Sequence, residues 1–242
     1  MFTHYRAHFE ANRARPLPHI EAPPLDEHRR AVLARSLAVF QLGETGEGRI
    51  AHQVQTARLP LIDDDYRAAV KLFVAEEGRH ARILALMVKA LGGRMLEESW
   101  TRHLFVFARR RIGVRFKLLV LLSAEVIAIG FYGLLARALP PGAMASALEQ
   151  ICADERVHFD FHCDFFSGQP RVFHWLWWPL AAAAALTVLF DHRRTLRAFG
   201  VSLPDAARVL LGFVAEAATK MGRQRAPALT HSSTLQSWAS SR

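Results

Sequence analysis

Two Glu-x-x-His units occur in this chain, the first beginning at Glu77 and the second at Glu155. Residues three positions apart share one face of an α-helix, so the acid and the histidine of each unit can reach a single metal ion. Glu47 and Glu125 are separated by the same interval as the two units, and each stands equally far ahead of one of them. Surface charge has no reason to repeat at one offset. The repeat therefore predicts a fold in which four separate segments bring these side chains together.

The segments that carry these residues have the apolar period of amphipathic helices. In the first segment, one stripe of positions spaced by three and four residues runs from Leu33 to Val54, and Glu44 and Glu47 lie on it. Prolines and glycines separate the segments, as expected where helices end and begin. The breaks predict four long helices and a shorter amphipathic stretch, over residues 26–59, 63–92, 114–139 and 140–166 and over residues 96–111, respectively.

Further helices are predicted after the fourth long one. They cover residues 172–199 and 203–221, and Ser202 is a suitable N-cap for the second because an acidic residue follows three positions later. No segment alternates apolar and polar residues as a strand does. We therefore predict an all-α fold: a four-helix bundle over residues 26–168, with accessory helices at 169–222 packed on it.

The two ends of the chain are predicted to lie outside this bundle. Residues 1–25 contain four prolines and are expected to form an extended N-terminal arm, and the Ser-rich residues 223–242 a flexible tail. The formal charge of +9 would suit an acidic partner, but the arginines are scattered and no nucleic-acid-binding motif is present, so we expect no nucleic-acid partner. The polar N-terminus does not resemble a signal peptide, and a cytoplasmic location is expected.

Glu125 is the only charged residue between Lys117 and Arg137, in a segment that is otherwise almost wholly apolar. A helix of this composition is buried on nearly all sides. An isolated carboxylate in such surroundings must be protonated, paired or bound to a metal ion, because burying a bare charge is costly. The position of Glu125 therefore supports a metal site in the interior of the bundle.

The combined pattern resembles the ferritin-like di-iron carboxylate proteins, in which two helices supply one Glu each and two supply Glu-x-x-His. The resemblance covers residues 30–167. It implies that six side chains bind two iron ions: Glu47, Glu77, His80, Glu125, Glu155 and His158. Four carboxylates balance two Fe(II) ions, and oxygen and imidazole ligands suit iron or manganese, including a mixed Mn/Fe pair.

Two positions near this set have alternative interpretations. Glu44 lies on the same stripe as Glu47, and its slightly longer separation from Glu77 also suits such folds, so it is the alternative ligand. The internal repeat favours Glu47. Tyr132 lies two turns beyond Glu125 on the same face and is a candidate proton or electron relay, although a packed aromatic residue is the simpler interpretation.

The acidic residues just before each Glu-x-x-His unit are candidates to position the ligand histidines. Imidazole ligands usually donate their second ring N–H to an acceptor. In the family that this chain resembles, the acceptor is often the acid that precedes the unit on the opposite helix. The resemblance thus implies that Asp154 orients His80 and that Glu76 orients His158. A solvent-facing position is the alternative for both acids.

The resemblance implies an enzyme that uses two iron ions and O2 to oxidise a small or lipid-like organic substrate, as oxygenases, oxidases and desaturases of this group do. Electrons would come from an external ferredoxin or flavoprotein. No Cys-x-x-Cys is present, which excludes a rubrerythrin with its rubredoxin-like site. Two alternatives are a metal-handling or peroxide-scavenging protein without an organic substrate, and a binding protein whose metal site is only structural.

The segment from Trp175 to Phe190 is an apolar run with arginines on both sides. It is shorter than the roughly 20 residues needed to cross a bilayer, and Pro179 interrupts it. A buried fifth helix or a subunit interface, as in a homodimer, is therefore expected. The alternative is an in-plane anchor on a membrane surface, because tryptophans beside basic residues suit that interface and a quinone-type hydroxylase would need access to lipid.

Overall fold

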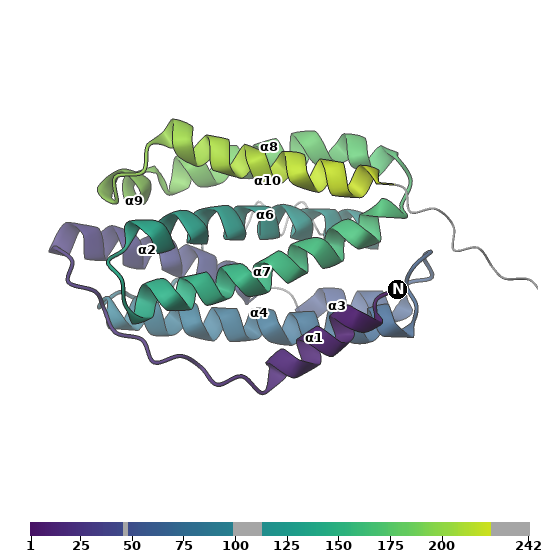
Figure 1. Ribbon diagram of the computed structural model, residues 1–242, viewed down its shortest axis with the longest axis horizontal. Helices are drawn as coiled ribbons and strands as arrows, with labels where there is room; N and C mark the ends of the chain where they lie inside the picture. Colours follow the sequence, from purple (N-terminus) through teal and green to yellow (C-terminus); the bar gives the residue numbers. More distant parts are fainter. Residues whose placement is uncertain (46–47, 99–112, 224–242) are drawn as a thin grey trace, which may run out of the picture.

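The computed structural model describes residues 1–45, 48–98 and 113–223. Within these ranges every regular element is a helix, which confirms the predicted all-α class, and Figure 1 shows their arrangement. In chain order the helices are α1 (Thr3–Arg13), α2 (Glu27–Glu44), α3 (Gly48–Thr56), α4 (Asp64–Ala90), α6 (Val114–Ala138), α7 (Ala143–Ser167), α8 (Val172–Asp191), α9 (Arg193–Ala198) and α10 (Leu203–Gly222).

Polar side chains begin three of these helices. At the start of α2, the Asp26 carboxylate accepts a hydrogen bond from the backbone N–H of Arg29, 2.8 Å away. The Asp63 carboxylate does the same for the N–H of Tyr66 at 2.7 Å, and Ser202 caps α10 as predicted. Such caps satisfy backbone donors that have no partner inside the helix, and they explain why these helices begin where they do.

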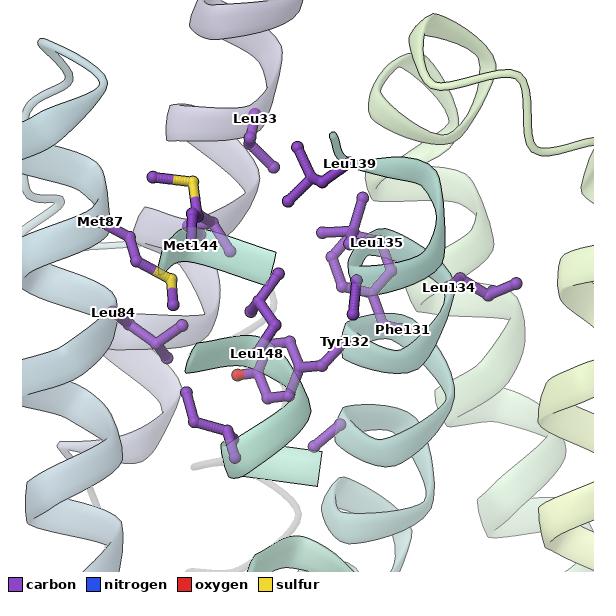
Figure 2. Close-up of a cluster of buried hydrophobic side chains, with 14 of the residues drawn as sticks. Leu33, Leu84, Met87, Phe131, Tyr132, Leu134, Leu135, Leu139, Met144 and Leu148 are labelled. Atoms are coloured by element: carbon purple, nitrogen blue, oxygen red, sulfur yellow. The ribbon is translucent and has the colours of Figure 1, made fainter. Parts of the chain in front are cut away.

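Helices α2, α4, α6 and α7 form the bundle, with α2 packed against α4 and α6 packed against α7. A first apolar cluster fills one end, where side chains from all four helices point toward one another: Figure 2 shows Leu33, Leu84, Met87, Leu135, Met144 and Leu148. A second apolar cluster fills the other end and includes Tyr66, Phe73, Leu122, Phe161 and Phe165. Both Glu-x-x-His units lie between these two clusters along α4 and α7.

The first predicted helix, over residues 26–59, is divided. α2 ends at Glu44 and α3 begins at Gly48, and residues 46–47 lie outside the described part of the chain. The sequence has glycines at positions 43, 46 and 48. Each glycine costs about 1 kcal/mol relative to alanine in a helix, an effect that apolar periodicity does not reveal. The prediction of one continuous helix was therefore wrong.

The predicted extended arm over residues 1–25 is wrong for its first half, which forms α1 ahead of the prolines. Between α1 and α2 the chain has no regular helix. Phe2, Tyr5 and Phe9 are almost completely buried in the second apolar cluster, and this burial of aromatic area holds α1 in place. Figure 1 shows α1 beside α4, on the side of the molecule away from α8 and α10.

The C-terminal helices α8 and α10 pack together and against α6. Gly130 permits this close approach, because a Cβ there would lie 2.5 Å from a methyl carbon of Leu210. Both α6 and α8 are long and apolar enough to span a membrane. The most apolar stretch of α6 is mostly buried within the protein, whereas only 28% of the corresponding stretch of α8 is buried. The predicted stretch at 96–111 and the predicted tail at 223–242 lie almost wholly outside the described residues.

Candidate metal centre

A cluster of acids and histidines fills the space between the two apolar clusters. Glu77 and His80 project from α4, Glu155 and His158 project from α7, and all four are at most 3% exposed. Each offers one ligand atom, and these atoms lie within 4.8 Å of one another. The spacing of three residues places the acid and the histidine of each unit on the same face of its helix. These four groups could hold a metal ion.

Helices α6 and α2 each add one carboxyl group to this cluster. Glu125 of α6 is buried beside Glu155, and its Oε2 lies 3.8 Å from His158 Nδ1. Glu44, the last residue of α2, lies close enough to Glu77 for the charge of that acid to raise its pKa. Four helices thus contribute four acids and two histidines, and the acids from α2 and α6 lie beside the acids from α4 and α7.

The first helix supplies Glu44 to the cluster, the residue that the sequence left as the alternative. Glu47, which the repeat favours, lies outside the described residues. The preference for Glu47 as the ligand from this helix therefore stays a prediction. Tyr132 reaches the same point, because its hydroxyl donates to Glu44 Oε1 at 3.1 Å. Burial and the charge of Glu44 raise the pKa of Tyr132 well above 10.0, so its phenol keeps its proton.

The pKa shifts within the cluster favour two negatively charged acids beside two positively charged histidines. Burial and the charge of neighbouring acids raise the pKa values of Glu44 and Glu125 well above 4.5. Burial also opposes ionisation of Glu77 and Glu155, but contacts with the histidines and the neighbouring carboxyl groups outweigh it. These contacts lower the pKa of Glu77 to about 2 and hold that of Glu155 well below 4.5. Although burial alone would lower them, the pKa values of both histidines are raised well above 6.5 by these carboxylates, so two carboxylates face two imidazolium groups.

The outer nitrogens of the two histidines are held by the acids that the resemblance implied. Asp154 Oδ2 lies 3.4 Å from His80 Nε2, and Glu76 Oε2 lies 3.0 Å from His158 Nε2. Each acid comes from the helix opposite its histidine, and both acids are buried rather than solvent-facing. The Nδ1 atoms consequently face the cluster, where His80 Nδ1 is 2.9 Å from Glu155 Oε1.

Residues near the N-terminus support these two acids, and sequence reasoning missed them. The Asn12 amide donates to Glu76 at 2.9 Å, and the Arg15 guanidinium donates to Asp154 at 2.9 Å. The Arg79 guanidinium of α4 lies 3.5 Å from the same Asp154 carboxylate. No motif or spacing in the N-terminal segment marks it as part of a site. The aromatic residues that precede its prolines were the only signal of a buried helix there.

The donor atoms of the cluster suit a shared cation better than they suit hydrogen bonds to one another. Glu77 Oε1, His80 Nδ1 and Glu155 Oε1 are buried and have no aligned hydrogen-bond partner among the described residues. Yet His80 Nδ1 is 2.9 Å from Glu155 Oε1, and His158 Nδ1 is 3.0 Å from Glu77 Oε1. Buried polar atoms without partners are costly unless a cation binds them, so the geometry fits metal binding. Carboxylate oxygen and imidazole nitrogen are donors that suit iron or manganese.

His162 lies one turn beyond His158 and is buried beside the cluster. Its Nε2 is 3.8 Å from Glu125 Oε1, and neither ring nitrogen has a hydrogen-bond partner among the described residues. Burial, followed by the charge of His158, lowers its pKa to about 3, so its imidazole is neutral. A neutral imidazole at this place could serve as a further ligand.

Comparison of the chain with family models, curated proteins and solved structures gave no match. What the site can bind therefore follows from its own donor atoms. These are three buried carboxyl groups, the half-buried carboxyl group of Glu44 and two buried imidazoles, contributed by α2, α4, α6 and α7.

Proposed function

We propose that this protein is a ferritin-like di-iron oxidoreductase that uses O2 to oxidise a small or lipid-like organic substrate. The observation that carries the proposal is the convergence of four acids and two histidines from four helices in one largely buried cluster. Four carboxylates match the charge of two divalent ions once all are ionised. The same donor set, distributed in the same way over four helices, is used by the di-metal carboxylate proteins.

The six side chains of the cluster would hold the metal pair, with iron favoured and manganese or a mixed pair as alternatives. Iron bound there would supply the chemistry that activates O2. Asp154 and Glu76 keep the imidazole rings oriented, and the apolar clusters on both sides exclude water. Tyr132 holds a proton next to Glu44 at the edge of the cluster. Electrons are proposed to come from an external ferredoxin or flavoprotein.

Anaerobic loading with Fe(II) should give about two iron ions per chain, and exposure to O2 should then produce near-ultraviolet absorbance. His158→Ala should reduce bound iron to about one ion per chain or less, because it removes a ligand atom. His28→Ala, which changes an exposed histidine of α2, is the matched control and should keep both ions. Metal analysis after gel filtration measures the content, and circular dichroism checks that the helices persist.

A native chain that binds no iron, or only one ion, would contradict the proposal. Rapid consumption of peroxide without any O2-dependent oxidation would instead indicate the metal-handling or peroxide-scavenging alternative. An iron pair that reacts with neither O2 nor peroxide would indicate a structural metal site.

A further inference from the structure

One acid of the cluster differs from the others in its exposure. Glu77, Glu125 and Glu155 are at most 3% exposed, and both cluster histidines are completely buried. Glu44 is only half-buried, and it also lines a cavity of about 370 Å³ between α2 and α4. Cavities that take small molecules have volumes of roughly 300 Å³ and above. The cavity therefore joins the protein surface to the metal cluster at the Glu44 carboxyl group.

The lining of this cavity combines apolar walls with one positive charge. Val74, Ala81 and Ala85 of α4 supply methyl groups, and Gln41 of α2 supplies an amide. Arg82 is exposed at the rim, and its guanidinium has no acidic partner within the described part of the chain. A guanidinium in this position can form two parallel hydrogen bonds with a carboxylate.

We propose that this cavity is the substrate entrance and that it selects a small organic acid, with the carboxylate held by Arg82 and the apolar body directed toward Glu44. A charged head stays near water because its burial is costly, whereas an apolar body gains from contact with the alanine and valine side chains. This inference rests on the proposed di-iron function and adds a substrate class to it.

Gly78 offers a way to close the cavity without disturbing the helix. It lines the cavity on α4, and a Cβ added there would have no neighbour within 4 Å. Replacing glycine by a larger residue inside a helix also favours the helix. Gly212 of α10 is a matched control, because a Cβ added at that position likewise meets nothing within 4 Å.

The test uses the full chain loaded with Co(II), whose visible spectrum reports changes at the metals, and benzoate as the probe. Gly78→Leu and Arg82→Gln should each retain the metal pair and bind benzoate at least about tenfold more weakly. Gly212→Leu and Lys89→Gln, which changes an exposed charge of the same helix, should leave benzoate binding unchanged. Uncharged benzyl alcohol should bind at least about tenfold more weakly than benzoate to the native chain.

The possible outcomes distinguish failure of the cavity proposal from failure of the proposed di-iron function. A chain that binds two Co(II) ions, but whose benzoate affinity is undetectable or is the same in all variants, would overturn the cavity proposal and leave the metal centre intact. A chain that binds no metal would overturn both.

A second inference comes from an independent feature, the outer face of α8. Val172, Trp175, Trp178, Leu186 and Phe190 are all exposed, with Trp175 at 78% and Leu186 at 68%. They follow the helical period on one side of α8, over about 27 Å at about 1.5 Å per residue. Monomeric proteins rarely expose a continuous apolar stripe of this length.

The opposite face of α8 already packs on the protein. Trp177 is completely buried, and its indole N–H donates to the carbonyl oxygen of Val214 at 3.0 Å. Ala181, Ala185 and Val188 are buried on the same side. A helix with one face against protein can expose only the other to lipid, so α8 would lie in the plane of a membrane rather than cross it.

The arginines at both ends of this apolar stripe indicate which kind of partner it binds. Arg171 precedes it, and Arg193, Arg194 and Arg197 follow it, whereas the stripe itself contains no acidic residue before Asp191. Tryptophan and arginine together suit the headgroup region of a bilayer, and four arginines favour anionic lipid. We propose that the exposed face of α8 binds the surface of an anionic phospholipid membrane.

Sedimentation of the protein with vesicles tests this proposal. Vesicles that contain phosphatidylglycerol should bind the protein at least about tenfold more strongly than pure phosphatidylcholine vesicles. The double variant Trp175→Ser/Trp178→Ser should lose at least about tenfold in affinity, whereas Leu211→Ser, at an exposed position of α10, should not. Absence of vesicle binding would overturn the proposal. A dimer in light scattering that this double variant converts to a monomer would also overturn it, and would assign the stripe to a second copy of the chain.

Discussion

Replacing Glu155 by Gln should remove the metal pair and lower the free energy of unfolding of the metal-free protein by about 3–5 kcal/mol. Glu155 is completely buried, with one oxygen 2.9 Å from His80 Nδ1 and the other 3.2 Å from His158 Nδ1. Its carboxylate is one of two that balance the imidazolium charges. An amide cannot replace that charge, so an uncompensated positive charge would be left inside the bundle. Guanidinium unfolding in the presence of a chelator measures the loss, and metal analysis measures binding.

Glu125→Gln provides the sharpest comparison for this result. In the metal-free protein the neutral form of the Glu125 carboxyl is favoured, because burial and the charge of Glu155 raise its pKa. An amide preserves a neutral hydrogen-bonding group, so the unfolding free energy should change by no more than about 1 kcal/mol, although metal binding is lost. Glu149→Gln, at an exposed position of α7, should change neither. Equal destabilisation by Glu155→Gln and Glu125→Gln would contradict the proposed division between ionised and protonated acids.

Metal loading should release about four protons per chain and should weaken steeply as the pH falls. In the metal-free cluster the raised pKa values favour a proton on the carboxyl groups of Glu44 and Glu125 and on the imidazoles of His80 and His158. Ligand atoms must give up these protons to bind a cation. Each proton displaced makes the affinity fall about tenfold per pH unit over the range in which it is held. Calorimetry of Mn(II) binding in buffers of different ionisation enthalpy counts the protons.

The same pKa shifts fix how stability depends on pH. The folded pKa values of these four groups lie above their ordinary values of 4.5 and 6.5. Above pH 6.5 the folded metal-free protein therefore holds more protons than the unfolded chain, and its stability falls as the pH rises through the raised pKa values. Metal replaces these protons, so the gain in Tm on loading should widen between about pH 6 and about pH 8. A constant gain across this range, or release of fewer than about two protons, would contradict the assignment.

The sequence determined which helices carry the candidate metal ligands of α4, α6 and α7. The apolar period predicted the helices, and the Glu-x-x-His spacing put each acid and histidine on one helix face because that relation is local. The lone charge in the apolar segment predicted the burial of Glu125, since such a helix has few exposed positions. The roles of Asp154 and Glu76 followed from the resemblance, and the structure places both acids against the histidines that it implied.

Only the tertiary structure decided which groups from other parts of the chain meet this cluster. Glu44 reaches it from the last turn of α2, and the glycines that end this helix leave the apolar periodicity unchanged, so the sequence did not show where the helix ends. Asn12 and Arg15 reach it because α1 packs on α4, a contact between segments that are far apart in the sequence. The cavity beside Gly78 and the exposed face of α8 depend on which neighbours cover each helix. The spacing of residues along one helix determines which side chains share a face of that helix. The packing of distant segments determines which other residues, or which solvent, that face contacts.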